Sequence, residues 1–331
     1  MTVRFLAIFG SMLLLSFVTI SCAHETEADN LSRDRQEAEI REKSSVPDKR
    51  RSSRDISQTR SQTKLAKASV TISAKSSAET KYGTITGKFV LKGDVPKREF
   101  LIKNGKRIGS DDLPKNPEVC AVKDLRSDEL IIDPKHKGIG NIFVYLREAP
   151  DTIHPDLKAV PKEKIKFDQV ACRFVPHTLL VRTGQTVLIM SDDNCSHNFH
   201  TYPFNNDGEN FTVTAKLRKG IPLKHEAPEK LPTKIVCDLH TWMTSWWLIL
   251  DHPYAAITVA KAGKGKDGSV IGTFKIEKLP YGKYRFRCYH ERAGYIGDGK
   301  TFKYGFDVTV DKPLHKLKPI EVSPDEFKED H

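Results

Sequence analysis

The 331-residue sequence predicts an all-β protein, with two β units that follow a polar N-terminal segment. Short runs rich in β-branched and aromatic residues recur along the chain, and each run ends at Gly, Pro, Asp or Asn. No segment has the long, capped apolar period that is typical of an α-helix. A composition of 38% hydrophobic and 29% charged residues fits soluble globular units with a flexible tail.

The first 23 residues have the layout of a secretory signal peptide. Arg4 supplies a small basic region, an apolar run extends from Phe5 to Ile20, and the tripeptide Ser21-Cys22-Ala23 follows. Two interpretations stay open: cleavage after Ala23, which we favour, or lipid attachment at Cys22, for which the usual upstream leucine is missing. Both predict an exported protein of the periplasm or cell envelope, with membrane association only if Cys22 is lipidated.

Residues 24–82 are polar, mixed in charge and almost free of aromatic side chains. Such a segment cannot bury enough apolar surface to offset the loss of conformational entropy, so we expect a disordered tether. Order is expected to begin in the segment Gly83–Pro96, where alternating Ile85, Phe89 and Leu91 predict a strand and a turn.

The strands that follow are expected to form two units. Strand-like runs continue as LIIDP, NIFVYL, HTLLVRTGQTVLIMS, TKIVCDL and SWWLILDH, and we assign residues 83–258 to one domain with an N-terminal extension. After Tyr254 the pattern resets around a Gly-rich turn and the corner sequence LPYG. Residues 259–331 are therefore expected to form a second, smaller β-sandwich with a C-terminal tail.

Four candidate metal ligands occur in the first unit in a fixed order. His197 lies in the sequence HNFH after a hydrophobic strand, and Cys237, His240 and Met243 follow in the loop CDLHTWM between two strands. Two imidazoles and a thiolate in a trigonal plane, with a weak axial thioether, form a type 1 copper site. The soft sulfurs favour Cu(I) and the imidazoles suit Cu(II), so this set predicts one copper ion that carries single electrons.

Two other interpretations fit parts of this pattern. The loop CDLHTWM taken alone could be a buried corner that contains sulfur, and a cysteine with two histidines could bind zinc with water as the fourth ligand. The upstream His197 weighs against the buried corner, and Met243 weighs against zinc because thioether sulfur is a poor zinc ligand. His200 is a further candidate ligand, although a packing or hydrogen-bonding role is favoured for it.

The two loops resemble those of the cupredoxins, and the amicyanins most closely, in the HNxH arrangement and in the Cys-x-x-His-x-x-Met spacing. The resemblance implies a Greek-key β-sandwich that holds one copper ion. It implies that His197, Cys237 and His240 are equatorial ligands and that Met243 is the axial ligand. It also implies that Asn198 ties the two ligand loops together by hydrogen bonds.

The ligand loop departs from that of the small cupredoxins, which place proline there. This chain has Asp238, Leu239 and Thr241 in the loop, and Trp242 adjoins the candidate axial ligand. Asp238 and Trp242 are therefore expected to surround the ligands and to influence a reduction potential that the sequence does not fix.

Over about residues 83–300 the chain is also similar to exported bacterial proteins of the "methylamine utilization protein" or plastocyanin-like type. The shared stretches are CRFVPHTLLVRTGQTV, the HNxH loop, the CDxHxWM block and DHPYxAxT. Those proteins continue into a carboxypeptidase-regulatory-like or transthyretin-like module, which GTFKIEKLPYGKY and the pair His290-Glu291 match here. The resemblance implies a transthyretin-like sandwich for the second unit.

The cysteines outside the ligand loops are expected to pair, because exported thiols are oxidised unless a metal holds them. We favour a disulfide between Cys120 and Cys172, since both lie outside the ligand loops and each flanks a strand-like run. Cys288 could pair with Cys195 or stay buried and free. The role of Cys195, two residues before the first ligand histidine, stays open.

The function expected from these observations is one-electron transfer to or from a redox partner protein, and not catalysis. The chain has no CxxCH haem motif, no G-x-S-x-G turn and no phosphate-binding glycine loop. The net charge of +11 is spread over scattered lysines without a nucleic-acid-binding motif, so no nucleic-acid partner is expected. The alternative is a copper-storing or degenerate module whose C-terminal sandwich binds carbohydrate or a protein.

Overall fold

The computed structural model describes residues 81–110, 113–261, 270–299 and 303–328. The expected signal peptide, the lipidation candidate Cys22 and nearly all of the expected tether lie outside these residues, so those predictions stay predictions. No helix in the described ranges is both long enough and apolar enough to cross a bilayer.

The all-β class predicted from the short β-branched runs is confirmed in the described part of the chain. Its helical elements are four residues long each: α2 (Pro117–Cys120), α3 (Pro155–Lys158) and the 3-10 helix η2 (Pro324–Phe327). Every other named element is a strand. Pro at the start of each helix suits the first helical turn, where a backbone N–H has no intrahelical partner.

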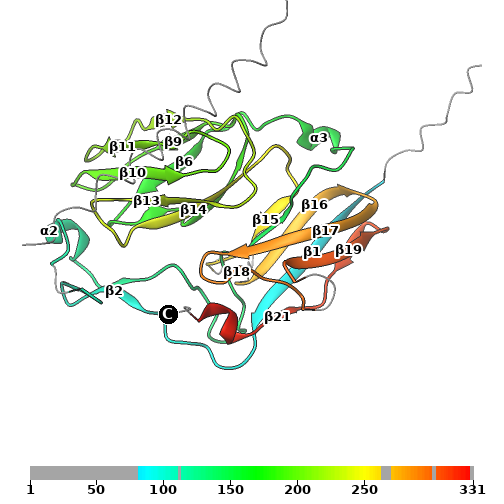
Figure 1. Ribbon diagram of the computed structural model, residues 1–331, viewed down its shortest axis with the longest axis horizontal. Coiled ribbons are helices and arrows are strands. Elements are labelled where there is room, and N and C mark those ends of the chain that lie inside the picture. Colours follow the sequence, from blue (N-terminus) through cyan, green and yellow to red (C-terminus); the bar gives the residue numbers. More distant parts are fainter. Residues whose placement is uncertain (1–80, 111–112, 262–269, 300–302, 329–331) are drawn as a thin grey trace, which may run out of the picture. The chain divides into compact units, whose positions relative to one another are not determined.

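Two sheets form a sandwich that carries the candidate ligands (Figure 1). Their strands are β6 (Ile165–Gln169), β7 (Phe174–Val175), β8 (Thr178–Arg182), β9 (Val187–Ile189), β10 (His197–Tyr202), β11 (Asn210–Val213), β12 (Ile221–Leu223), β13 (Thr233–Val236) and β14 (Thr244–Leu250). One sheet has the order β11-β10-β13-β14-β8 and the other has the order β12-β9-β6-β7. The pairs β8–β14 and β6–β9 are parallel, and the remaining pairs are antiparallel.

Aromatic side chains from both sheets fill the core of this sandwich. The Phe167 ring on β6 meets the edge of the Trp247 ring on β14 at a centroid distance of 4.7 Å, and it lies 6.0 Å from Phe199 on β10. Along β10, His197, Phe199 and Thr201 are buried, because alternate residues of a strand face the same side of the sheet. The pleat therefore directs the imidazole of His197 to the core side, away from water.

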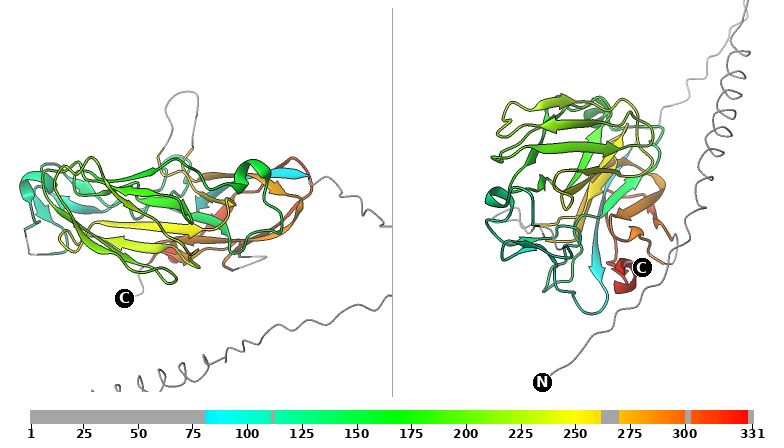
Figure 2. Two further views of the ribbon diagram at one scale, coloured as in Figure 1. Left: turned by 90° about the horizontal axis from the view of Figure 1, so that it is seen from above. Right: turned by 60° about the vertical axis from the view of Figure 1, so that its left-hand side comes forward.

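A second pair of sheets lies around a separate core (Figures 1 and 2). Their strands are β1 (Tyr82–Leu91), β5 (Phe143–Leu146), β15 (Ala255–Ile257), β16 (Thr273–Pro280), β17 (Gly282–His290), β18 (Gly294–Tyr295), β19 (Gly305–Val310), β20 (Leu314–Lys316) and β21 (Ile320–Val322). One sheet has the order β16-β1-β20 with β21 also paired to β1, and the other has the order β15-β5-β17-β18 with β19 also paired to β17. Phe286 and Phe306 stack at 5.3 Å within this core.

The strands of this second pair come from both sides of the expected boundary at residue 258. β1, from the start of the described chain, pairs with β16, β20 and β21, and β5 pairs with β17. The described residues fall into one compact unit. The limits 83–258 and 259–331 stay a prediction, but the sheets join strands that these limits separate.

A small third sheet and α2 form the segment that the sequence marks as an N-terminal extension. The sheet has the order β3-β2-β4, from β2 (Phe100–Lys103), β3 (Lys106–Arg107) and β4 (Leu125–Arg126). A disulfide joins Cys120, at the end of α2, to Cys172, in the turn between β6 and β7. Both turn residues, Ala171 and Cys172, have positive φ angles of 50° and 53°, as a two-residue hairpin turn of the primed type requires.

Candidate metal centre

The loop that carries three of the candidate ligands is a compact turn between β13 and β14. The backbone N–H of His240 donates to the carbonyl of Cys237 at 3.2 Å, and the N–H of Met243 donates to the carbonyl of His240 at 2.8 Å. The N–H of Cys237 closes the turn on the carbonyl of Met243 at 3.2 Å. These bonds fix the Cys-x-x-His-x-x-Met segment although it lacks the prolines of the small cupredoxins.

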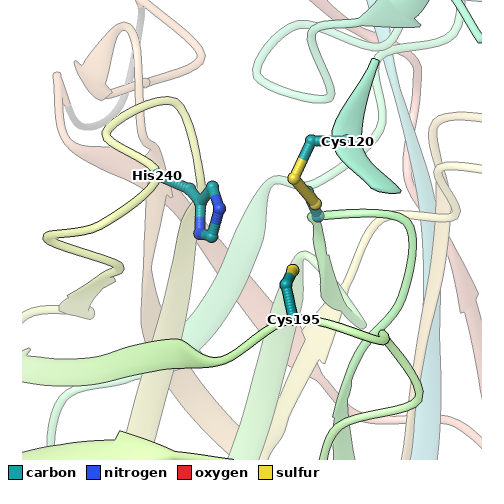
Figure 3. A group of neighbouring side chains, drawn as sticks. Cys120, Cys195 and His240 are labelled. Carbon is teal, nitrogen blue, oxygen red and sulfur yellow. A yellow bond between two sulfur atoms is a disulfide. The ribbon is translucent and has the colours of Figure 1, made fainter. Parts of the chain in front are cut away.

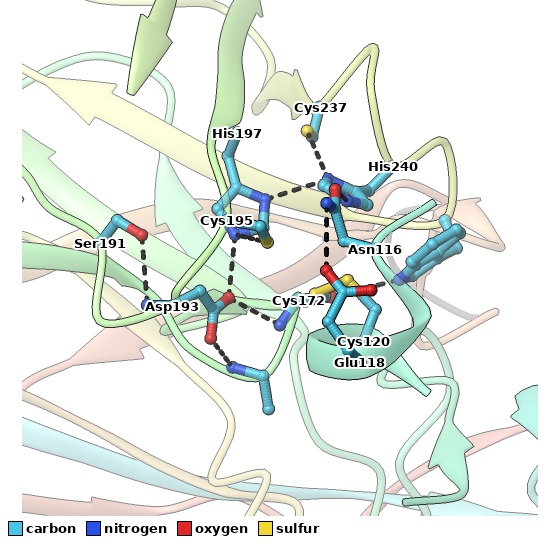
Figure 4. The surroundings of a disulfide bond; sticks show 12 residues. Asn116, Glu118, Cys120, Cys172, Ser191, Asp193, Cys195, His197, Cys237 and His240 are labelled. Atoms are coloured by element: carbon cyan, nitrogen blue, oxygen red, sulfur yellow. Dashed lines mark hydrogen bonds and ion pairs between the residues drawn. A yellow bond between two sulfur atoms is a disulfide. The ribbon is translucent and has the colours of Figure 1, made fainter. Parts of the chain in front are cut away.

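The structure brings His197, Cys237 and His240 together. Their metal-binding atoms lie within 4.8 Å of one another, and all three residues are fully buried (Figure 4). The Nδ1 atoms of His197 and His240 are 3.1 Å apart, and Nδ1 of His240 is 3.5 Å from Sγ of Cys237. Two imidazole nitrogens and one sulfur thus converge on one point inside the sandwich.

The outer ring nitrogens of both histidines face hydrogen-bond acceptors. Nε2 of His197 lies 2.9 Å from a carboxylate oxygen of Asp193, and Nε2 of His240 lies 3.2 Å from Oδ1 of Asn116 (Figure 4). The amide of Asn116 is oriented by its Nδ2, which donates to Glu118 at 3.4 Å. In the metal-binding state both Nε2 atoms would donate to these acceptors, which leaves the lone pair of each Nδ1 for the metal ion.

This proton arrangement is what a metal site needs. A hydrogen bond between the two Nδ1 atoms would require a third proton on the pair of rings, whereas a metal ion accepts both lone pairs at once. The residues present therefore fit a bound metal ion, and the two histidines are held in the tautomer that ligation uses.

The surroundings of Cys237 favour the thiolate form of its side chain. In the metal-free site a ring proton on Nδ1 points at this sulfur: burial raises the pKa of the thiol, but hydrogen bonds from His197, from His240 and from the backbone N–H of Asn198 outweigh burial and lower that pKa to about 6. The Asn198 N–H lies 3.2 Å from the sulfur. The thiolate is the form that ligates metals, so Cys237 is in its metal-binding form near neutral pH.

The Asp193 carboxylate stabilises the protonated form of His197. Burial raises the pKa of its carboxyl, but hydrogen bonds from His197 and from the N–H groups of Cys172 and Ala171 outweigh burial and lower it. For His197 burial lowers the pKa, and the bonds to Asp193 and Cys237 outweigh burial, so that pKa is raised. The carboxylate thus orients the imidazole and also holds the hairpin turn that carries Cys172.

Asn198 connects the two ligand-bearing segments, the link that the cupredoxin resemblance implies for it. Its Oδ1 accepts from the backbone N–H of Asp238 at 3.2 Å, and its Nδ2 donates to Asn210 at 2.7 Å. Together with its own N–H bond to Cys237, Asn198 fixes the sulfur relative to the histidine strand.

Met243 and Trp242 lie at the end of the turn. Met243 is buried in the same hydrophobic core as Cys237. The indole N–H of Trp242 donates to the carbonyl of Cys172 at 3.2 Å, and its ring meets the ring of His240 edge-on at 5.3 Å. Trp242 therefore packs over one side of the ligand imidazole.

His200 does not join the cluster. It lies two positions from Asn198 on the outward side of β10, the side opposite to His197. Its Nδ1 is 3.1 Å from the exposed carboxylate of Asp238 and 3.2 Å from the Tyr202 hydroxyl. His200 and Asp238 are hydrogen-bonded at the surface beside the ligand loop, and the hydrogen-bonding role favoured for His200 describes it better than the ligand role.

Outside the cluster, the cysteines in the described part of the chain divide into three kinds. Cys120 and Cys172 form the disulfide that we favoured from the sequence. Cys195 is buried without a disulfide, with its sulfur 3.7 Å from Nε2 of His197. Cys288 is also unpaired and lies in the other core, so the alternative pairing of Cys195 with Cys288 is wrong.

Sequence reasoning missed two neighbours of the ligands, Asp193 and Asn116. Asp193 lies four residues before His197, in the loop that leads into β10, which is a signal that the sequence offers. Asn116 lies far from the ligand loops in the chain and begins α2 with a left-handed φ of 50°. No local pattern places it over His240, because a disulfide and the fold of the extension bring it there.

No family model matches this chain, and no curated protein sequence does. Solved structures similar to part of it include a Cu-containing nitrite reductase from Thermus scotoductus, amicyanin from Paracoccus versutus and a purple cupredoxin from Nitrosopumilus maritimus. They are 19%, 13% and 20% identical, with TM-scores of 0.23, 0.23 and 0.21. The matches cover 29%, 27% and 26% of this chain, and 24%, 84% and 98% of the respective structures. Identities and TM-scores this low support no conclusion on function. The function is therefore inferred from the geometry of the candidate site.

Proposed function

We propose that this protein is a type 1 copper protein that carries one electron at a time. The observation that supports the proposal is the convergence of the Nδ1 atoms of His197 and His240 on the sulfur of Cys237, while each Nε2 faces an acceptor. Two imidazoles and a thiolate form the trigonal set of such sites, and Met243 would be the weak axial ligand. Copper bound there would supply the Cu(II)/Cu(I) redox couple.

The surroundings suit a metal that changes charge with little movement. Backbone hydrogen bonds close the ligand turn, Asp193 and Asn116 orient the two rings, and Asn198 fixes the sulfur. A frame held this closely resists large changes in ligand position when an electron arrives or leaves. Copper is favoured over zinc because a thioether at the fourth position is a poor ligand for zinc.

A second candidate function is copper binding without electron exchange. The observation that favours it is the complete burial of His240, whose Nε2 is covered by Asn116 at the start of α2. An imidazole edge open to solvent would offer a partner a short route to the metal. Here the route from that ring runs through the Asn116 amide or through Trp242.

We further propose that the protein is exported, that it exchanges electrons with a redox partner protein and that it catalyses no reaction of its own. The supports are the apolar segment after Arg4 and the Cys120–Cys172 disulfide, because such bonds persist in oxidising compartments. Membrane attachment is proposed only for a form lipidated at Cys22.

The test is to load the purified chain with one equivalent of Cu(II), then measure bound copper and the visible absorption. We expect one tightly bound copper and an intense thiolate-to-copper band that Cys237→Ser abolishes. Cys288→Ser, which changes a buried thiol in the other core, should leave the band unchanged. Copper binding with the band but without reversible reduction would favour the second candidate, and absence of the band would refute both a type 1 site and the ligand assignment.

A further inference from the structure

Three sulfur atoms and one imidazole form a second group beside the proposed copper ligands. Cys120, Cys172, Cys195 and His240 each place a ligand atom within 4.8 Å of the others, and all four residues are buried (Figure 3). Two of the sulfurs are joined as the disulfide, and the third is the thiol of Cys195. Only His240 belongs to both groups.

The four side chains are held by four separate pieces of the fold. Cys120 lies at the end of α2, where its N–H donates to the carbonyl of Asn116 at 2.8 Å. Cys172 is held in its turn by the Asp193 carboxylate at 2.8 Å and by the Trp242 indole on its carbonyl. Backbone contacts of this kind remain when the S–S bond opens, so they would keep the sulfurs close.

Reduction would change the chemistry of this group without moving its backbone. A dithiol reductant transfers two electrons to the Cys120–Cys172 bond, which yields two thiols, and the reductant leaves as its own disulfide. The group then contains three thiols and an imidazole. A Cys₃His set is a tetrahedral site for thiophilic metal ions, and loss of the thiol protons accompanies metal binding.

The spacing fits such a site. With metal–sulfur bonds of about 2.3 Å, tetrahedral geometry separates two sulfur ligands by about 3.8 Å. The ligand atoms now lie within 4.8 Å of one another, about 1 Å above that value, and the disulfide sulfurs would need to move apart. Burial excludes competing water from the site.

We propose that the Cys120–Cys172 disulfide masks a second metal site, which reduction converts into a Cys₃His site for a thiophilic d¹⁰ ion, Cu(I) or Zn²⁺. The ligands are Cys120, Cys172, Cys195 and His240. The site does not use Cys237, so it can be tested apart from the proposed electron-transfer site. Both donor sets need the one free ring nitrogen of His240, so they would compete for it in the reduced protein, and the masked site is isolated in Cys237→Ser.

The test compares full-length Cys237→Ser, in which the first site is disabled, before and after reduction with a phosphine under nitrogen, with the phosphine removed before titration. Separate arms measure binding of Cu(I) in competition with a chromogenic chelator, and binding of Zn²⁺ in competition with another chelator. We expect one additional equivalent of at least one of these ions after reduction. Equal stoichiometry in the oxidised and reduced forms for both ions would overturn the proposal.

Variants separate this site from the proposed copper centre. Cys195→Ser should remove the additional equivalent, and Cys288→Ser, a matched buried thiol outside the group, should retain it. Both changes are made in the Cys237→Ser background, where the equivalent that depends on reduction is measured without the first site. An additional equivalent that survives Cys195→Ser would refute the assignment of the ligands.

X-ray absorption provides a readout that does not depend on a folded Cys195 variant. In reduced Cys237→Ser loaded with one equivalent of the metal that binds, three sulfur neighbours are expected around the ion. One sulfur neighbour or none would contradict the proposal, because no Cys₃ set would then surround the metal.

Discussion

Asp193 is the residue with the most roles around the candidate centre. One carboxylate oxygen lies 2.9 Å from Nε2 of His197, and the two oxygens accept from the N–H groups of Ala171 and Cys172 at 2.6 and 2.8 Å. The same negative charge therefore sets the tautomer of a ligand and supports a turn made of two residues with positive φ. A carboxylate behind a ligand imidazole also raises the basicity of that ligand.

Asp193→Asn should weaken metal binding by about 10- to 100-fold, because the amide keeps the size of the side chain but lacks its charge. Competition titration against a chelator measures the change. Asp192→Asn is the matched control, since this neighbour is half-exposed and pairs with Lys216 at the surface. Equal affinities in both variants would show that Asp193 acts on the turn alone.

Cys237 predicts a pH dependence for metal binding. Its thiol pKa is lowered to about 6, so above pH 6 the thiolate is already formed and metal binding displaces no proton from sulfur. As pH falls below 6 each unit should reduce the affinity by up to about tenfold through this group. Ultraviolet thiolate absorbance of the metal-free protein, taken as the difference from Cys237→Ser, should have a midpoint near pH 6. A midpoint near 8.5, the ordinary value, would contradict the hydrogen bonding described for this sulfur.

At the scale of the element, the pleat of β10 places the candidate ligand on the core face and other polar residues on the outward face. His197, Phe199 and Thr201 face the core, while Asn198 and His200 face outward. Asn198 still reaches the ligand loop because its amide oxygen accepts from the backbone N–H of Asp238, just past the end of β13. His200 meets only the exposed side chains of Asp238 and Tyr202 there.

The two outward residues of β10 should therefore respond differently to truncation. Asn198→Ala removes a hydrogen bond between the ligand segments, which is worth about 1 kcal/mol of stability, and should shift the thiolate-to-copper band. His200→Ala removes a surface contact with Asp238 worth at most about 1 kcal/mol and should leave the band in place. Absorption spectra of both copper-loaded variants test this, and a band lost in His200→Ala would make His200 a ligand.

At the scale of the whole molecule, the second pair of sheets depends on strands from distant parts of the chain. Ile85 and Phe89 of β1 are fully buried against strands that follow residue 272. Each such side chain contributes about 1.5 to 3 kcal/mol when buried, and without β16 and β21 that surface would face water.

A chain that ends at residue 258 should therefore not fold to a soluble monomer with cooperative thermal unfolding. It would retain β1, β5 and β15 but lose their hydrogen-bonded partners β16 and β17, which leaves open edges and apolar faces. Size-exclusion chromatography and thermal denaturation, compared with the full chain, measure this. A monomeric, cooperatively unfolding fragment would show that residues 83–258 fold as the independent domain expected from the sequence.

The sequence contains enough local information for the all-β class and for the grouping of the ligand residues. Strand alternation and turn residues are local signals, and the spacing of Cys237 and His240 lies within one turn. The pairing of β1 with C-terminal strands is nonlocal, so no local pattern encodes it. The burial of His240 under Asn116 has the same origin, because the contact depends on how the extension folds back over the sandwich.

The most direct test of the central claim is a redox titration of the copper-loaded protein, followed by its visible absorption. A type 1 site formed by His197, Cys237, His240 and Met243 predicts an intense band that one electron per copper removes and that reoxidation restores. A band that is absent, or bound copper that takes up no electron reversibly, would contradict the proposed electron-transfer function.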